Sequence, residues 1–143
     1  MKNYFLYSAI VLGMSFNLQA QNLKADEIKV SDQDAVVLYR YVAGAGVPVV
    51  EDTVNEILHA EVMMCSIYFN AGVGPKKVRC LLPREQVNIE NDNAFEVAEI
   101  LKKYGMPSDH QFGYETVQAG LDCTKDLSGE QFPICYLSPR TMQ

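Results

Sequence analysis

The sequence has few of the residues that catalysis and metal binding require. It contains two histidines, His59 and His110, and no two of its four cysteines are separated by two residues, as in zinc sites and redox-active dithiols. Nucleophile-elbow, zinc-protease, phosphate-loop and calcium-loop motifs are also missing. We therefore expect a protein that is not an enzyme and that holds no metal and no cofactor. A small hydrolase that uses one of the two histidines is the enzymatic alternative.

Positive charge is also scarce. There are 12 Lys and Arg residues against 18 Asp and Glu, which gives a formal net charge of −6. Because nucleic acids and anionic membranes need a basic surface, we expect neither as a partner. A local basic group is interpreted as a solvated hairpin edge that limits strand-to-strand aggregation; it comprises Lys76, Lys77, Arg79 and Arg84.

Only one long apolar run occurs, and it lies within the first twenty residues. It follows an early lysine, is broken by Ser8, Gly13 and Ser15, and precedes a small residue, Ala20. A membrane span needs about 20 apolar residues in a row, so the pattern predicts a secretory signal peptide over 1–20 instead of an anchor. We expect cleavage near Ala20 and a periplasmic or secreted protein.

The four cysteines lie in two strand-like hairpins. Cys65 and Cys80 stand in the two arms of "MCSIYFNAGVGPKKVRC" (64–80), whose centre is rich in turn residues, and Cys123 and Cys135 flank a second such turn. Four cysteines in a small exported protein indicate two disulfides. We predict one bond per hairpin, Cys65–Cys80 and Cys123–Cys135.

The chain also shows an internal repeat. Residues 34–48 align with residues 93–107 at an offset of about 59. Each segment carries an apolar stripe at helical spacing and ends in Gly-x-Pro, which predicts two helices with Asp32 and Asn91 as N-caps. The matched positions are Ala35, Leu38, Tyr39, Val42, Gly46 and Pro48 in the first segment, and Ala94, Val97, Ala98, Leu101, Gly105 and Pro107 in the second.

These features predict an α+β fold: two tandem helix-plus-disulfide-braced β-hairpin repeats forming one antiparallel sheet with helices on one face. The expected boundaries are an N-terminal extension 21–31, repeat unit 1 at 32–83, a linker 84–90, repeat unit 2 at 91–138 and a C-terminal tail 139–143. Two segments stay open between helix and strand. Residues 52–61 show a capping box and helical spacing, whereas 111–120 alternate like a strand.

The function that we expect is non-catalytic protein binding, most concretely by an inhibitor or immunity-type protein that occludes a partner enzyme. A rigid, disulfide-braced scaffold loses little entropy on binding. The contacts would come from apolar residues opposite the cysteines, with the 70–77 loop at the rim. The structural alternative is a self-assembling envelope protein that forms a homodimer through this face. If segments 52–61 and 111–120 cover the face instead, its apolar residues are ordinary core. The predicted contacts are Met64, Tyr68, Leu81, Ile134 and Tyr136.

Overall fold

The computed structural model describes residues 26–70, 74–129 and 131–140, without the side chains of residues 70 and 74–76. The predicted signal peptide and its cleavage point near Ala20 lie outside the described residues, as does the centre of the 70–77 loop.

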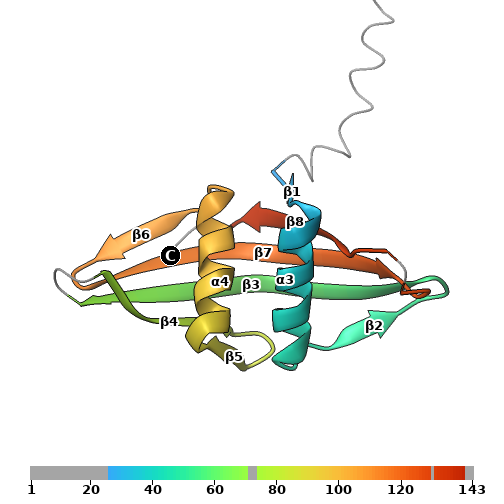
Figure 1. Ribbon diagram of the computed structural model, residues 1–143, viewed down its shortest axis with the longest axis horizontal. Helices are drawn as coiled ribbons and strands as arrows, with labels where there is room; N and C mark the ends of the chain where they lie inside the picture. The colour runs from blue at the N-terminus through green and yellow to red at the C-terminus, as the bar shows by residue number, and fades with distance from the viewer. Residues whose placement is uncertain (1–25, 71–73, 130, 141–143) are drawn as a thin grey trace, which may run out of the picture.

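The described residues form an α+β fold of two helices on one antiparallel sheet of eight strands. Both helices cross the same face of the sheet (Figure 1). The strand order is β1-β8-β7-β3-β4-β5, with β2 also paired to β3 and β6 also paired to β7. The elements are β1 (Ile28–Lys29), α3 (Asp32–Gly44), β2 (Val49–Glu51), β3 (Asn55–Asn70), β4 (Gly74–Leu82), β5 (Val87–Glu90), α4 (Asn91–Lys103), β6 (Ser108–Gln111), β7 (Tyr114–Asp126) and β8 (Ile134–Pro139).

Two long strands, β3 and β7, form the middle of the sheet. They pair from Asn55↔Asp126 to Tyr68↔Tyr114, with an irregularity between Ala60 and Met63. The other edge of β3 takes β2 and then β4, and the other edge of β7 takes β6 and β8. Both undecided segments therefore lie mainly in strands. The helical interpretation of 52–61 is wrong, because from Asn55 onward this segment belongs to β3.

The helices bury the stripes that the sequence predicts. Ala35, Leu38 and Val42 of α3 are buried, and so are four residues at matching positions of α4. The N-caps lie one residue earlier than expected. Ser31 caps α3, where its Oγ accepts from the backbone N–H of Asp34 at 3.2 Å, and Glu90 precedes α4 without a side-chain cap. The buried α4 residues at matching positions are Ala94, Val97, Ala98 and Leu101.

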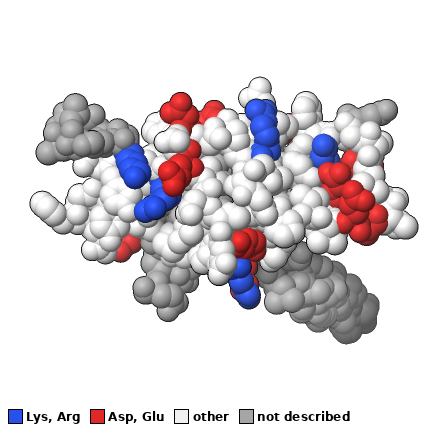
Figure 2. All heavy atoms as spheres, turned by 90° about the horizontal axis from the view of Figure 1, so that it is seen from below, with Lys and Arg blue, Asp and Glu red and all other residues white. Residues whose placement is uncertain are grey.

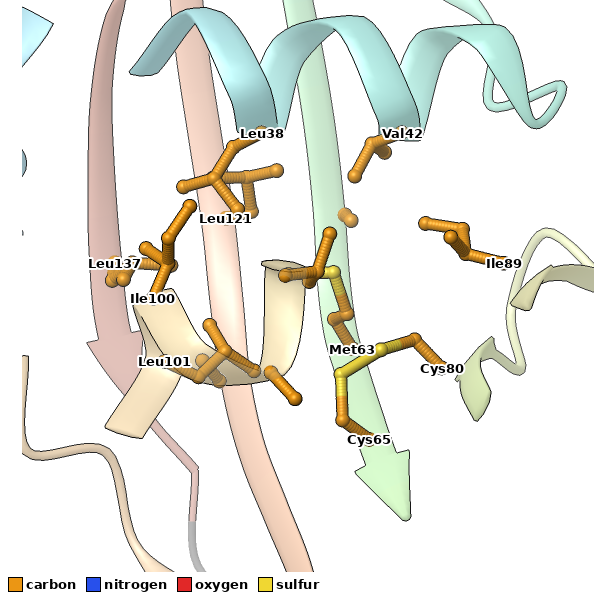
Figure 3. Packing of buried hydrophobic residues seen from close by; sticks show 14 of the residues in the cluster. Leu38, Val42, Met63, Cys65, Cys80, Ile89, Ile100, Leu101, Leu121 and Leu137 are labelled. Carbon is orange, nitrogen blue, oxygen red and sulfur yellow. A yellow bond between two sulfur atoms is a disulfide. The ribbon is translucent and has the colours of Figure 1, made fainter. Parts of the chain in front are cut away.

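Both predicted disulfides are formed, and they lie in the core between the sheet and the helices. Figure 3 shows the Cys65–Cys80 bond. A sulfur of the Cys65–Cys80 bond lies 3.7 Å from the carbonyl oxygen of Ala94 in α4. A sulfur of the Cys123–Cys135 bond lies 3.6 Å from the carbonyl oxygen of Ala35 in α3. Structural disulfides persist in oxidising compartments, so the two bonds indicate an exported environment.

Two segments outside the expected repeat units also join the sheet. Val87–Glu90, within the expected linker, forms β5 against β4, and Ile28–Lys29 of the N-terminal extension pairs with β8. Among the described residues, neither helix is long and apolar enough to cross a membrane.

Candidate protein-binding surface

The side of the sheet away from the helices carries no other layer of described structure; we call it the open face. Alternation along a strand assigns side chains to it, because Met63, Cys65 and Leu121 point into the core. Their neighbours therefore point the other way. On the central strands the open face includes Ile57, His59, Met64, Ser66 and Tyr68 of β3 and Tyr114, Thr116, Gln118, Gly120, Asp122 and Thr124 of β7.

All five predicted contact residues belong to the open face, but they form two groups. Met64 is paired with Leu81 across β3 and β4, and Tyr68 follows on the same strand. Ile134 and Tyr136 lie on β8, beyond β7. Leu81, Ile134 and Tyr136 are exposed, whereas Met64 and Tyr68 are half-buried. Segments 52–61 and 111–120 lie within the sheet, so the expected alternative in which they cover this face is wrong.

A polar band separates the two groups. Nδ1 of His59 lies 2.5 Å from Oδ1 of Asp122, directly across the β3–β7 ladder. Beside this pair, Arg140 lies over Gly120 and donates from Nε to the carbonyl of Glu61 at 2.9 Å. That carbonyl lies in the irregular stretch between Ala60 and Met63, where β3 has more residues than β7. The band therefore combines the His59–Asp122 pair with Arg140 and the β-bulge of β3.

One end of the sheet gathers aromatic side chains; we call it the aromatic end and define it as Tyr68, Tyr114 and Phe112. The rings of Tyr68 and Tyr114 lie 5.5 Å apart between centroids. Phe112 is fully exposed at the tip of the β6–β7 hairpin, in a turn where Gly113 has a φ of 89°. The backbone N–H of Phe69 donates to the carbonyl of Gly113 at 3.0 Å, which fixes this tip against the end of β3.

Sequence reasoning missed Phe112 and Arg140. Phe112 counted as one position of an alternating strand, although the following glycine is the signal of a two-residue hairpin turn. Arg140 lay in the expected C-terminal tail, and no local pattern links it to Gly120.

Each histidine lies beside a carboxylate. His110 Nε2 is 3.8 Å from Oε1 of Glu115, a buried carboxylate that also accepts from Lys102 Nζ at 2.8 Å. The side chains of His59 and His110 are both well exposed, so solvent reaches each contact from the side of the histidine. Within the described ranges, no three His, Cys, Asp or Glu side chains are grouped so as to hold a metal ion.

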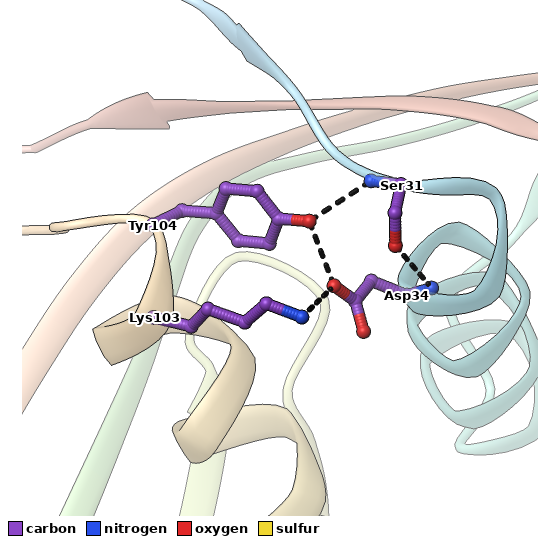
Figure 4. A network of polar contacts seen from close by, with 4 residues as sticks. All are labelled: Ser31, Asp34, Lys103 and Tyr104. Atoms are coloured by element: carbon purple, nitrogen blue, oxygen red, sulfur yellow. Dashed lines mark hydrogen bonds and ion pairs between the residues drawn. The ribbon is translucent and has the colours of Figure 1, made fainter.

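A polar network fixes the two helices behind this surface (Figure 4). Oδ2 of Asp34 accepts from Lys103 Nζ at 2.8 Å and from the Tyr104 hydroxyl at 2.7 Å, and that hydroxyl accepts from the backbone N–H of Ser31 at 2.9 Å. Burial raises the pKa of Asp34, but hydrogen bonds to Lys103, Tyr104 and Ser31 outweigh it and hold this pKa below 3.8. The carboxylate thus binds α4 to the start of α3.

Charges on the surface are mixed. Seen from below in Figure 2, acidic side chains gather at the end where β2 lies, and both signs alternate along the rest of this side. A hollow of about 500 Å³ on the open face is lined by Glu27, Ile57, Asp122, Thr124 and Tyr136, together with part of Cys123. The surface therefore offers apolar patches between polar groups.

Comparison with protein families, curated proteins and solved structures finds no match for this chain.

Proposed function

We propose that the protein is an exported, non-catalytic protein-binding module, and most concretely an inhibitor or immunity-type protein that occludes the site of a partner enzyme. The observation that carries this proposal is the aromatic end. Phe112 projects fully into solvent from a hairpin tip that a backbone hydrogen bond ties to β3. Exposed aromatic rings often supply much of the binding energy at protein interfaces.

The rigidity of the surrounding scaffold supports the same proposal. The aromatic end stands on β3 and β7, the two strands that carry Cys65 and Cys123 of the buried disulfides. A preorganised surface loses little conformational entropy when it binds, which favours tight occlusion. Met64, Leu81, Ile134 and Tyr136 remain predicted contacts of the open face.

The experiment starts with the oxidised protein as bait for exported and secreted extracts. An enzyme that is retained is then purified, and its inhibition is titrated with the wild type, Phe112→Ala and Phe132→Ala. Phe132 is the matched control, because it is also exposed (62%) but lies beside α3 in a different surface hollow. We expect Phe112→Ala to weaken inhibition about tenfold or more and Phe132→Ala to leave it unchanged. Equal effects of the two variants would contradict the proposal.

We further propose that the two halves of the fold are tandem repeats. The order α3-β2-β3-β4 matches α4-β6-β7-β8. The pairs Val49↔Leu58 and Ser108↔Val117 differ by 59 at both members, and each half contains one disulfide. Superposition of the backbone of 32–83 on that of 91–138 in a crystal of the oxidised protein tests this proposal. N-terminal sequencing of the exported protein tests the signal peptide.

A further inference from the structure

The open face has two halves that are complementary to each other. The apolar pair Met64 and Leu81 lies on one side of the polar band, and Ile57 and Val50 lie on the other. The band contains a cation and an anion. Arg140 lies over Gly120 of β7, and Asp122 is two residues further along the same strand. From this arrangement we propose that the open face is covered by a second copy of the chain in a twofold dimer.

The strand register determines how two such faces meet. The residues that pair across the strands form rows, and the row of Gly120 is adjacent on this face to the row of His59 and Asp122. Consider a twofold axis that lies between the two sheets, runs perpendicular to the strands and passes over Leu121. Rotation about this axis places the Gly120 row of one copy on the His59–Asp122 row of the other. Arg140, which lies over Gly120, then faces Asp122 of the second copy, and the reciprocal pair forms at the same time.

The next rows meet with apolar side chains opposite each other. The row of Gln118, Met64 and Leu81 falls on the row of Thr124, Ile57 and Val50 of the second copy. Met64 therefore faces Ile57 of the second copy. Ile57 lines the hollow of about 500 Å³, and this hollow can accommodate the flexible Met64 side chain. Packed sheets cross at about 30°, so this correspondence holds best for the rows nearest the axis.

The available area suits a stable dimer. Residues 116–126 of β7 span roughly 36 Å, and four strand positions cover roughly 19 Å, so each copy contributes a footprint of at most about 700 Å². The outer positions are filled by the shorter strands, so two copies would bury up to about 1,400 Å², and specific interfaces begin at about 1,200 Å². The row of Tyr68 and Tyr114 falls beyond the end of β7 in the second copy and stays uncovered. In this dimer Met64, Leu81, Ile134 and Tyr136 contact the second copy in place of a partner enzyme. The dimer thus goes beyond the proposed function, which then depends on the aromatic end that stays available in each copy.

Sedimentation of the oxidised, exported protein over a range of concentrations tests the proposal without any target enzyme. We expect a reversible dimer that Asp122→Arg and Arg140→Asp each weaken about tenfold or more, since each variant opposes like charges across the axis. The double variant exchanges the charges and should restore the dimer, which a merely misfolded protein would not do. A wild type that sediments as a monomer at every concentration overturns the proposal.

A second pair of variants tests which face is used. Leu81→Asp on the open face should abolish the dimer, whereas Phe95→Asp should not, although Phe95 is similarly exposed (41% against 38% for Leu81) on α4. A dimer that survives Leu81→Asp and is lost with Phe95→Asp overturns the proposal in favour of the helix face. Loss of enzyme inhibition in Phe112→Ala is a separate result, because Phe112 lies outside the footprint.

Discussion

The guanidinium of Arg140 occupies the space that a side chain at position 120 would fill. A Cβ added to Gly120 would lie 2.5 Å from Nη2 of Arg140 and 2.8 Å from Oγ of Ser138. Because Gly120 has no side chain, Arg140 can lie over β7 at this position and hydrogen-bond to the carbonyl of Glu61.

This relationship predicts that the effect of an alanine at position 120 depends on Arg140. In the wild type, Gly120→Ala should displace the guanidinium and lower the free energy of unfolding by about 1 kcal/mol. In an Arg140→Ala background the Ser138 hydroxyl is no longer held by Arg140 Nη1 and can rotate away from the new Cβ. The same change should then raise the free energy of unfolding by about 0.5 kcal/mol, because alanine loses less backbone entropy than glycine in a strand. Urea denaturation of the four proteins measures both effects. The same sign in both backgrounds would contradict the prediction.

Because of Asp34, the free energy of unfolding should decrease at acid pH. Its pKa is lowered in the folded protein, so its contribution is present above pH 3.8 and is lost as the pH falls further through the folded value. Asp34→Asn should lower the free energy of unfolding by about 1 kcal/mol at neutral pH, and the difference from the wild type should shrink towards pH 2. Denaturation over this pH range measures the difference. Asp32→Asn, an exposed change in the same helical turn, is the control.

Because of Tyr39, the free energy of unfolding should also decrease at alkaline pH. Burial, together with its 2.6 Å hydrogen bond to Glu56 and the charges of Glu56 and Glu51, raises the pKa of Tyr39 from 10.0 to about 12. Its contribution is therefore complete below pH 10 and is lost as the pH rises towards about 12. Tyr39→Phe should cost about 1 kcal/mol at neutral pH and make the variant less sensitive to alkali. Denaturation at neutral and alkaline pH tests this, with exposed Tyr136→Phe as the control.

Each disulfide should contribute about 3 kcal/mol, because the closed loops of 15 and 12 residues restrict the unfolded chain. The paired serine variants, Cys65→Ser with Cys80→Ser and Cys123→Ser with Cys135→Ser, measure the two values by urea denaturation. Since all four sulfurs are buried, reduction of the native protein by dithiothreitol should be slow and should accelerate with mild denaturant. Fast reduction in native buffer would show that the helices do not protect these bonds.

The sequence predicts those parts of the fold whose signals are local. The apolar stripes place Ala35, Leu38 and Val42 correctly in the core, and the cysteine spacing predicts both bonds. The segment from residue 52 misleads because its spacing also suits a helix. Its neighbour on one side, β7, lies more than fifty residues away and leaves no trace in the local pattern, although its neighbour on the other side, β2, is close in sequence. Ser31 replaces Asp32 as cap because both residue types can cap a helix, and only the backbone decides between them.

The candidate surface is predicted only in part for the same reason. Alternation assigns Met64, Tyr68 and Leu81 to one face, but it cannot show that Ile134 and Tyr136 lie beyond an intervening strand. The polar band depends on long-range approach: Arg140 contacts Glu61 only because a bulge in β3 frees a carbonyl beside the end of β8.

The pairing of β1 with β8 has a consequence for how the chain acquires its structure. Ile28–Lys29 finds its partner only in residues 136–137, so the first strand of the sheet must wait for the last. A chain that is synthesised from its N-terminus keeps β1 without its partner strand until β8 has been added. The hairpin of β3 and β4 can close before that point, whereas the edge formed by β1 and β8 depends on a contact between residues more than 100 positions apart.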